Sequence, residues 1–196
     1  MRLYSRATAR GEADILEVIP MARILVAHGS KRGSTAQIAE WIGEVLRDDG
    51  HEVDVLPADK ARQVLGYDAV ILGGSLYAGR WHAASRRFAR RHAKTLEACS
   101  VWLFSSGPLD HSAVDHDIAP VAQVAGVMAS VDALGHKTFG GRLLERPRGF
   151  VASMLAKSKA GDYRDRELVR AWAKEVSSQL DRPADRGDGG AERTGT

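Results

Sequence analysis

The segment RILVAHGSKRGSTAQIAEWIGEVL, residues 23–46, decides the fold class of this chain. Its first part, Arg23–Ala27, is an apolar run with the length and composition of a buried strand. Apolar side chains then recur every three or four residues, which predicts an amphipathic helix over Thr35–Asp49 that ends at Gly50. A buried strand that leads through a short loop into a helix is the first half of a strand–helix–strand unit.

The rest of the chain repeats this alternation of strand and helix. Helices are expected over Ala83–Leu96 and around Leu168, Trp172, Val176 and Leu180, the latter with Asp165 as its N-cap. The further strands are expected at Glu52–Leu56, Asp68–Gly73, Ser100–Ser105 and Ala133–Phe139. Short strand–helix connections imply a parallel sheet with helices on both faces. Five strands favour an α/β, doubly wound, flavodoxin-like sheet of order 2-1-3-4-5.

Composition and charge indicate one soluble globular domain. The 196 residues are 44% hydrophobic and 27% charged, and no apolar run approaches the roughly 20 residues of a membrane-spanning helix. The single cysteine, Cys99, cannot form an internal disulfide, so the cytoplasm is the expected compartment. The net charge of +3 suits an anionic ligand, an anionic membrane surface or nucleic acid without deciding among them.

The two ends differ from the middle in composition. Residues 1–20 carry three arginines with little periodic pattern, and we expect a disordered N-terminal extension; a start at Met21 is one explanation for it. Residues 182–196 are rich in Gly, Asp and Arg, and we expect a disordered C-terminal tail. The working domain is therefore predicted at residues 21–181.

The first loop after a strand has the chemistry of a phosphate site. It runs from His28 to Thr35, with glycines for close backbone approach and several hydroxyls. The free N–H groups and the dipole of the following helix suit an anion, and Lys31 and Arg32 add positive charge. The loop lacks both the Gly-Lys-Ser/Thr ending of a Walker loop and the Gly-x-Gly-x-x-Gly pattern of a dinucleotide site. The alternative is an ordinary strand–helix turn.

Two further loops follow strands that are expected to end at the same edge of the sheet. Residues 73–82 place Tyr77 and Trp81 beside small, flexible residues, and aromatic faces of this kind suit a flat ring. For either ring, packing is as good an explanation as ligand stacking. Residues 105–110 offer N–H groups and a rigid turn for the other side of such a ring.

One helix carries a strongly basic face. Five cations fall within roughly 140° of its circumference at 100° per residue. They are Arg86, Arg87, Arg90, Arg91 and Lys94, opposite Ala84, Phe88, Ala89 and Leu96. The face is either an ordinary solvated surface or a docking surface for an anionic partner or lipid.

The first loop resembles the phosphate-binding signature of flavodoxins, Ser/Thr-x-Thr-Gly-x-Thr. Here it reads Ser30-Lys31-Arg32-Gly33-Ser34-Thr35, with Arg32 where flavodoxins usually carry threonine. The resemblance implies non-covalently bound flavin mononucleotide (FMN), with the flavin ring held between the second and third loops. The cofactor-binding residues it implies are Ser30, Lys31, Arg32, Gly33, Ser34, Thr35, Ser75, Leu76, Tyr77, Ala78, Gly79, Ser105, Ser106, Gly107 and Pro108.

The second loop and the helix after it resemble the menaquinone-dependent protoporphyrinogen dehydrogenase family. In that family a Tyr-Gly-x-x-His segment leads into a basic helix with a His-Ala pair, here His92-Ala93. The resemblance implies an FMN-dependent dehydrogenation with a quinone as acceptor, and Arg80, Trp81 and His82 as substrate contacts. We assign no general acid or base and no metal. The family's inserted segment corresponds to Arg142–Lys159, a basic stretch that suits a quinone, a porphyrin, a membrane or the core.

Other functions remain open at this stage. An electron carrier that docks onto redox proteins is the main alternative, although the carriers we compare are acidic and this chain is basic. A scaffold that has lost its flavin is disfavoured by the complete phosphate loop. Nucleic-acid binding is not expected, because no recognisable module accompanies the basic residues. We expect a small-molecule redox substrate, with a quinone acceptor and peripheral contact with the membrane as further options.

Overall fold

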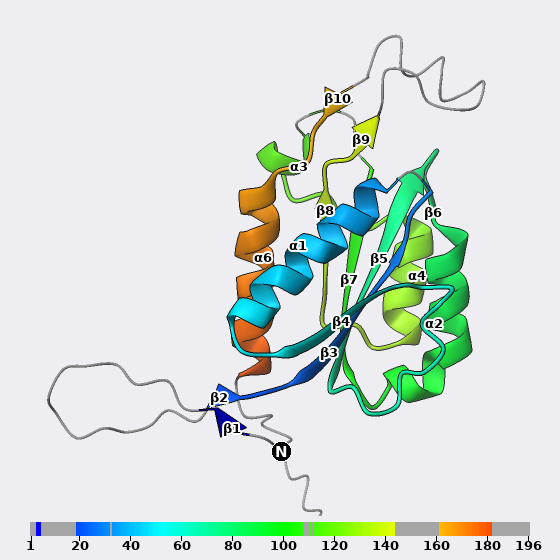
Figure 1. The fold of residues 1–196 in the computed structure, drawn as a ribbon. Coiled ribbons are helices and arrows are strands. Elements are labelled where there is room, and N and C mark those ends of the chain that lie inside the picture. The colour runs from blue at the N-terminus through cyan, green and yellow to red at the C-terminus, as the bar shows by residue number, and fades with distance from the viewer. Residues whose placement is uncertain are drawn as a thin grey trace, which may run out of the picture.

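Five parallel strands form the centre of the molecule (Figure 1). The structure is a computed structural model that describes residues 3–4, 19–31, 33–107, 110, 112–143 and 161–181. The strands are β3 (Arg23–Gly29), β4 (Glu52–Pro57), β5 (Ala69–Tyr77), β7 (Ser100–Ser106) and β8 (Gly135–Phe139). They lie in the order β4-β3-β5-β7-β8, and all neighbours are parallel. Counted along the chain this is the order 2-1-3-4-5, so the predicted doubly wound fold is confirmed.

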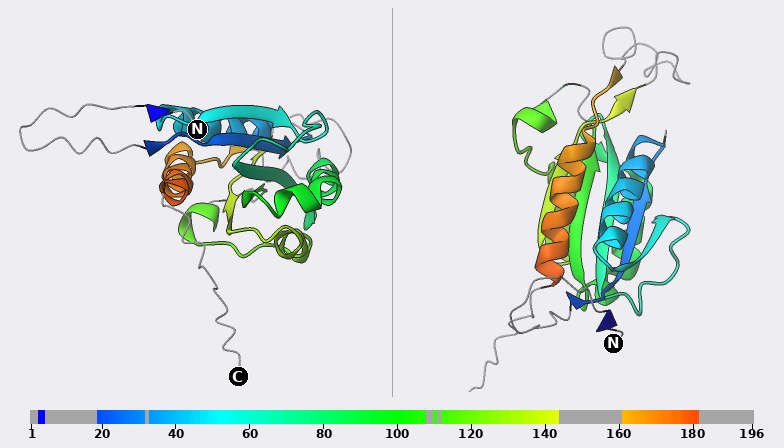
Figure 2. Two further views of the ribbon diagram at one scale, coloured as in Figure 1. Left: turned by 90° about the horizontal axis from the view of Figure 1, so that it is seen from below. Right: turned by 60° about the vertical axis from the view of Figure 1, so that its left-hand side comes forward.

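Helices cover both faces of the sheet (Figures 1 and 2). One face carries α1 (Ser34–Asp48) and α6 (Arg166–Leu180), and the other carries α2 (Ala83–Leu96) and α4 (Ala122–Ser130). Asp165 caps α6 by accepting hydrogen bonds from the N–H groups of the second and third residues after it, as the sequence predicts.

Two hydrophobic layers hold the helices on the sheet. Along β3, Ile24 and Val26 pack towards α1 and α6, whereas Leu25 and Ala27 pack towards α2 and α4. All four side chains are fully buried. Because both faces of the sheet are covered, the strand reads as a continuous apolar run rather than an alternating one.

Two helices were not expected from the sequence. They are α3 (Ser112–Asp115) and α4, which both precede β8. The sequence of α4, AQVAGVMAS, consists of small and apolar residues apart from Gln123, so it lacks the polar face that marks an amphipathic helix. Tertiary packing of Val124, which is fully buried, compensates for this weak local pattern.

Three short strand pairs lie outside the parallel order. β6 (Arg80–Trp81) pairs antiparallel with the end of β5, and β9 (Arg142–Leu143) pairs antiparallel with β10 (Gly161–Asp162). β1 (Leu3–Tyr4) pairs antiparallel with β2 (Ile19–Pro20).

Parts of three expectations lie outside the described residues. The expected terminal extensions fall largely on residues 1–2, 5–18 and 182–196, and most of the segment that corresponds to the family's insertion, Arg142–Lys159, falls on residues 144–159. Their disorder or function therefore stays a prediction. Among the described helices, none has both the length and the apolar character needed to cross a bilayer.

Four of the five cations on the predicted basic face of α2 are exposed, whereas Arg86 is half-buried. Arg87, Arg90, Arg91 and Lys94 are exposed, while Phe88 is fully buried beneath them. The Arg91 guanidinium also donates hydrogen bonds to two carbonyls of the segment that follows β4, those of Ala58 and Ala61, at 3.4 and 3.2 Å. Arg91 therefore has a structural role, and the other three cations project from the helix.

Candidate functional site

The carboxyl ends of β3, β5 and β7 lie side by side and bring the three predicted loops together. Gly29 at the end of β3 pairs with Gly74, and Ser75 on β5 pairs with Ser106 on β7. The strand order reverses between β3 and β5. In doubly wound sheets the ligand crevice opens at this edge, at the point of reversal.

The first loop is closed on itself by a glycine and a serine. Gly33 is the N-cap residue of α1 with a φ of 82°, in the left-handed region that favours glycine. Its N–H donates to Ser30 Oγ at 3.0 Å. No described side chain caps α1, so its first-turn N–H groups and its positive dipole end suit an anion. Lys31 is exposed beside them, and Arg32 lies outside the described residues.

Two hydroxyls at the start of α1 are buried and differ in their partners. Thr35 Oγ1 and Ser106 Oγ are hydrogen-bonded at 2.8 Å, which joins the first loop to the third. Ser34 is only 8% exposed, and its Oγ has no hydrogen-bond partner among the described residues. A buried hydroxyl without a partner costs about 1–3 kcal/mol. The Ser34 hydroxyl therefore lacks the partner that a bound anion would supply.

The second loop is a tight hairpin between β5 and β6. Leu76 pairs with Trp81 and Tyr77 pairs with Arg80, so only Ala78 and Gly79 lie between the strands. Both have positive φ, 48° and 70°, as in the type I′ turns that suit two-residue hairpins. Tyr77 is 47% exposed, and its ring is accessible to a flat ligand.

Trp81 is buried in the core. Its side chain is 1% exposed and packs among the residues under α2 and α4. A methyl group on Gly74 would lie 2.5 Å from the indole Nε1, so the ring lies directly against that strand. The structure therefore assigns packing to Trp81, and this burial argues against the substrate contact that the resemblance implied.

His82 lies at the junction of α2 and the first loop. It is the N-cap residue of α2, and its Nδ1 accepts a hydrogen bond from the Ala84 N–H at 3.3 Å. Burial, with a further contribution from the Arg87 charge, lowers the pKa of His82 below its ordinary value.

The third loop is held in place by hydrogen bonds to β8. Ser105 and Ser106 are buried, and Ser105 Oγ is hydrogen-bonded to His136 Nε2 at 3.0 Å. The Gly107 N–H donates to the Phe139 carbonyl at 3.2 Å. A methyl group on Gly107 would lie 2.6 Å from Leu76 Cβ, so the third loop closely approaches the second. Pro108 lies outside the described residues.

Two positioning residues were missed by the sequence analysis. Gln123 on α4 accepts a hydrogen bond from the Trp81 N–H at 3.1 Å and so holds the hairpin. His136 on β8 supports Ser105, and burial lowers the pKa of His136 to about 4. A polar residue within the expected strand Ala133–Phe139 was the available signal for His136. Nothing local marks Gln123.

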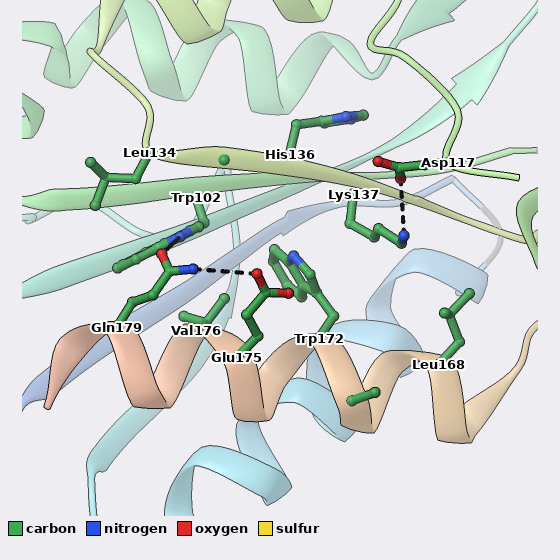
Figure 3. A pocket seen from close by; sticks show the side chains of 12 residues that line it. Trp102, Asp117, Leu134, His136, Lys137, Leu168, Trp172, Glu175, Val176 and Gln179 are labelled. Carbon is green, nitrogen blue, oxygen red and sulfur yellow. Dashed lines mark hydrogen bonds and ion pairs between the residues drawn. The ribbon is translucent and has the colours of Figure 1, made fainter. Parts of the chain in front are cut away.

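A groove of about 320 Å³ lies elsewhere, between β8 and α6 (Figure 3). Its polar side chains bond largely to one another. Trp102 Nε1 donates to Gln179 at 3.3 Å, and Lys137 pairs with Asp117 at 2.9 Å. In Figure 3 the His136 ring is turned away from α6, towards the opposite side of the sheet. The predicted site residues do not line this groove.

The residues at the carboxyl edge fit an FMN. The unpartnered Ser34 hydroxyl and the uncapped start of α1 suit its phosphate. Tyr77 and the backbone of Ser106 and Gly107 stand where the second and third loops approach each other, which suits a flat ring.

Comparisons with known proteins agree with this fold. Over 78 residues the chain is 28% identical to protoporphyrinogen IX dehydrogenase [quinone] of Escherichia coli (strain K12), a match that covers 39% of this chain and only 43% of that enzyme. Flavodoxin 2 from Bacillus cereus superposes with a TM-score of 0.55 at 20% identity, over 81% of this chain and 99% of that one. Rubredoxin oxygen:oxidoreductase from Desulfovibrio gigas gives a TM-score of 0.59 at 13% identity, over 82% of this chain and 36% of that one.

The family assignment rests on a sequence model. The model of the flavodoxin domain matches residues 25–167, which include most of β3, the three loops and the start of α6. This match spans well over half of the chain. The chain therefore belongs to the flavodoxin domain family, and its cofactor is FMN.

Proposed function

We propose that this chain is an FMN-dependent oxidoreductase that dehydrogenates protoporphyrinogen or a similar reduced substrate and transfers the electrons to a quinone. The observation that carries the proposal is the unpartnered Ser34 hydroxyl beneath the uncapped start of α1, a site for the cofactor phosphate. The partial match to the bacterial dehydrogenase supports the substrate class. Bound FMN supplies the redox chemistry, since it takes two electrons from the substrate and passes them to the acceptor.

The protein contributes binding and orientation. In this proposal, first-turn N–H groups of α1, Ser30, Lys31, Ser34 and Thr35 hold the phosphate. Tyr77 and the backbone from Ser75 to Gly79 cover one side of the flavin, and the backbone of Ser105 to Gly107 covers the other. Arg32 and Pro108 are proposed as further contacts by resemblance. The Thr35–Ser106 hydrogen bond fixes the first and third loops relative to each other, so the flavin meets a preformed site.

Arg80 is the residue that we propose for substrate binding. It is exposed and lies opposite Tyr77 on the hairpin, next to the proposed flavin position. A porphyrin substrate carries two propionates, and guanidinium groups bind carboxylates in a bidentate manner. Replacing Arg80 with alanine should raise the KM for an anionic substrate about tenfold with little change in FMN content. An unchanged KM would exclude this role.

The first experiment is the visible absorption spectrum of the purified full chain, followed by chromatography of the chromophore released by heat. About one FMN per chain is expected. Anaerobic mixing with protoporphyrinogen IX and the soluble quinone menadione should then generate porphyrin fluorescence faster than in a control without protein. A colourless protein that takes up no added FMN would contradict the cofactor assignment, and a flavoprotein without turnover would contradict the substrate.

An electron-transfer protein is the second candidate, and the basic face of α2 is the observation that favours it. Arg87, Arg90 and Lys94 project from a helix that begins at the edge carrying the three loops. Such a surface could steer an acidic redox protein. Substrate turnover with menadione alone would favour the enzyme, whereas reduction that requires a protein acceptor would favour the carrier.

The same face could bring the protein to an anionic membrane surface in the cytoplasm, where a lipid-soluble quinone is available. We propose this contact as peripheral. Co-sedimentation with vesicles that contain 30% phosphatidylglycerol, compared with vesicles of pure phosphatidylcholine, tests it. Binding should fall when Arg87, Arg90 and Lys94 are replaced with glutamine, and equal sedimentation with both vesicles would contradict an electrostatic contact.

A further inference from the structure

The Nδ1 edge of the His82 imidazole lies against Gly29, the last residue of β3, where the first loop leaves the strand. A methyl group placed on Gly29 would lie 2.6 Å from His82 Nδ1 and 2.3 Å from Ser85 Oγ. Gly29 directly precedes Ser30, the residue that closes the first loop. The glycine is therefore required by the close approach of the His82 ring, and the ring borders the loop that we assign to the phosphate.

The helix cap determines which nitrogen of the ring carries the proton. Because Nδ1 accepts a hydrogen bond from the Ala84 N–H, the neutral ring has its proton on Nε2. Among the described residues, no hydrogen bond involves Nε2. The lowered pKa of His82 favours this neutral form at pH 7. The ring therefore presents an N–H donor on the side opposite the cap.

The charges around the ring identify the class of ligand that this donor suits. Lys31 of the first loop and Arg87 of α2 act on His82 as nearby cations, and Asp59 acts as the opposing carboxylate. His28, at the end of β3, is close enough for its titration to respond to His82. Cations outnumber the single carboxylate in this set, so an anion is favoured beside the ring.

We propose that His82 donates a hydrogen bond from Nε2 to the phosphate of the bound cofactor and thereby makes the protein select FMN over riboflavin. This inference rests on the proposed flavin site. It gives His82 a role in cofactor selection in place of the substrate contact that the family resemblance implied. An N–H donor to a phosphate oxygen forms a charge-assisted hydrogen bond, which is stronger than a neutral one.

Two substitutions separate this role from the helix cap. Asparagine carries its polar atoms near the position of Nδ1, so H82N keeps an N-cap residue and loses the distal donor. Glutamine reaches further, so H82Q keeps a donor near the position of Nε2 and weakens the cap. The dissociation constants of FMN and riboflavin are measured by quenching of flavin fluorescence on the flavin-free full chain, with the thermal midpoint as the measure of folding.

H82N should weaken FMN binding about tenfold and leave riboflavin binding unchanged, while H82Q should stay within about threefold of the wild-type FMN affinity. A ratio of FMN to riboflavin affinity in H82N equal to that of the wild type would overturn the inference. Parallel losses of both flavins in both variants would also overturn it, since they indicate a purely structural role. If the wild type binds neither flavin, the proposed function fails first.

Discussion

The loops at the carboxyl edge and the groove between β8 and α6 are two regions with opposite chemistry. The groove has a volume of about 320 Å³, and its polar side chains, such as Trp102 and Gln179, bond to each other. The loops show no comparable internal pairing at Ser34, whose buried hydroxyl lacks a partner among the described residues. A left-handed Gly33 and the uncapped α1 accompany that hydroxyl.

The difference between the groove and the three loops shows that the volume of a cavity alone does not identify a ligand site. In the groove, the protein already supplies the partners that a ligand would offer, so binding there would have to break existing hydrogen bonds. At the loops, a ligand would satisfy groups that the fold leaves unsatisfied. Pre-organised loops with unsatisfied donors are typical of anion sites.

The largest effect is expected from a strained residue at Gly33. A β-branched residue is strongly disfavoured at a φ of 82°, so G33V should displace the first loop and weaken FMN binding about a hundredfold. Gly50 is a matched control, because it follows the other end of α1 with a φ of 95° and, like Gly33, has open space where a Cβ would lie. Isothermal titration with FMN and thermal unfolding are the measurements.

G50V and G33V should each lower the free energy of unfolding by about 1–3 kcal/mol. In G50V, however, the FMN affinity of the folded protein should be unchanged. Equal losses of FMN affinity in the two variants would show that the effect passes through α1 as a whole. In that case the phosphate would not be bound by the first loop.

The second prediction concerns His136, which supports the third loop through its hydrogen bond with Ser105. The pKa of His136 is about 4 in the folded protein, below the ordinary 6.5 of the unfolded chain, because the ring is buried. As the pH falls from 6.5 to 4 the unfolded chain takes up this proton first, so the free energy of unfolding should decrease. The decrease from His136 should be on the order of 2 kcal/mol, and stability should be independent of this group above pH 7.

H136Q isolates this contribution, because other histidines also have lowered pKa values. Glutamine can still hydrogen-bond Ser105 but does not titrate. Urea unfolding at pH 7 and pH 5 should show a smaller pH dependence for H136Q than for the wild type. An identical pH dependence would mean that His136 is not held neutral by the fold.

The third prediction separates stability from binding at Ser34. S34A removes a buried hydroxyl that has no partner among the described residues, so the flavin-free protein should be as stable as the wild type or more stable by up to about 1 kcal/mol. FMN binding should weaken about tenfold, because the phosphate loses a donor. Thermal unfolding of the flavin-free protein and FMN titration give the two values. A clear loss of stability together with unchanged FMN affinity would indicate that the hydroxyl has a partner within the protein.

Much of the fold could be predicted from the sequence, because local pattern and tertiary burial agree in most elements. Strands such as β3 are buried on both faces and read as continuous apolar runs, and α2 has a sharp division between Phe88 and its basic residues. The α4 helix could not be predicted in the same way. Its stability depends on contacts made by Val124 in the assembled core, and these leave no periodic pattern in nine residues.

The position of the candidate site was also accessible from the sequence, whereas the roles of individual side chains were not. Glycines and hydroxyls after strands mark the edge where the loops meet. The orientation of a ring is set by distant partners, however. Trp81 packs in the core against Gly74. Gln123, which is 42 residues further along the chain, accepts the hydrogen bond that holds the hairpin. Such pairings are properties of the packed structure.

The smallest effect is expected from a substitution in the groove. Its effect on the free energy of unfolding should have the opposite sign to that of S34A. Gln179→Ala removes the acceptor of the Trp102 indole N–H, a partly buried hydrogen bond at the groove, where water can replace the lost acceptor. The free energy of unfolding should therefore fall by only about 0.5–1 kcal/mol. The FMN dissociation constant should stay within twofold of the wild type, since the groove shares no residue with the three loops. A single series of urea unfolding and FMN titration on S34A and Q179A tests both. If Q179A weakened FMN binding as much as S34A, the two regions would be coupled through β7 and β8, and the groove would count as part of the flavin site.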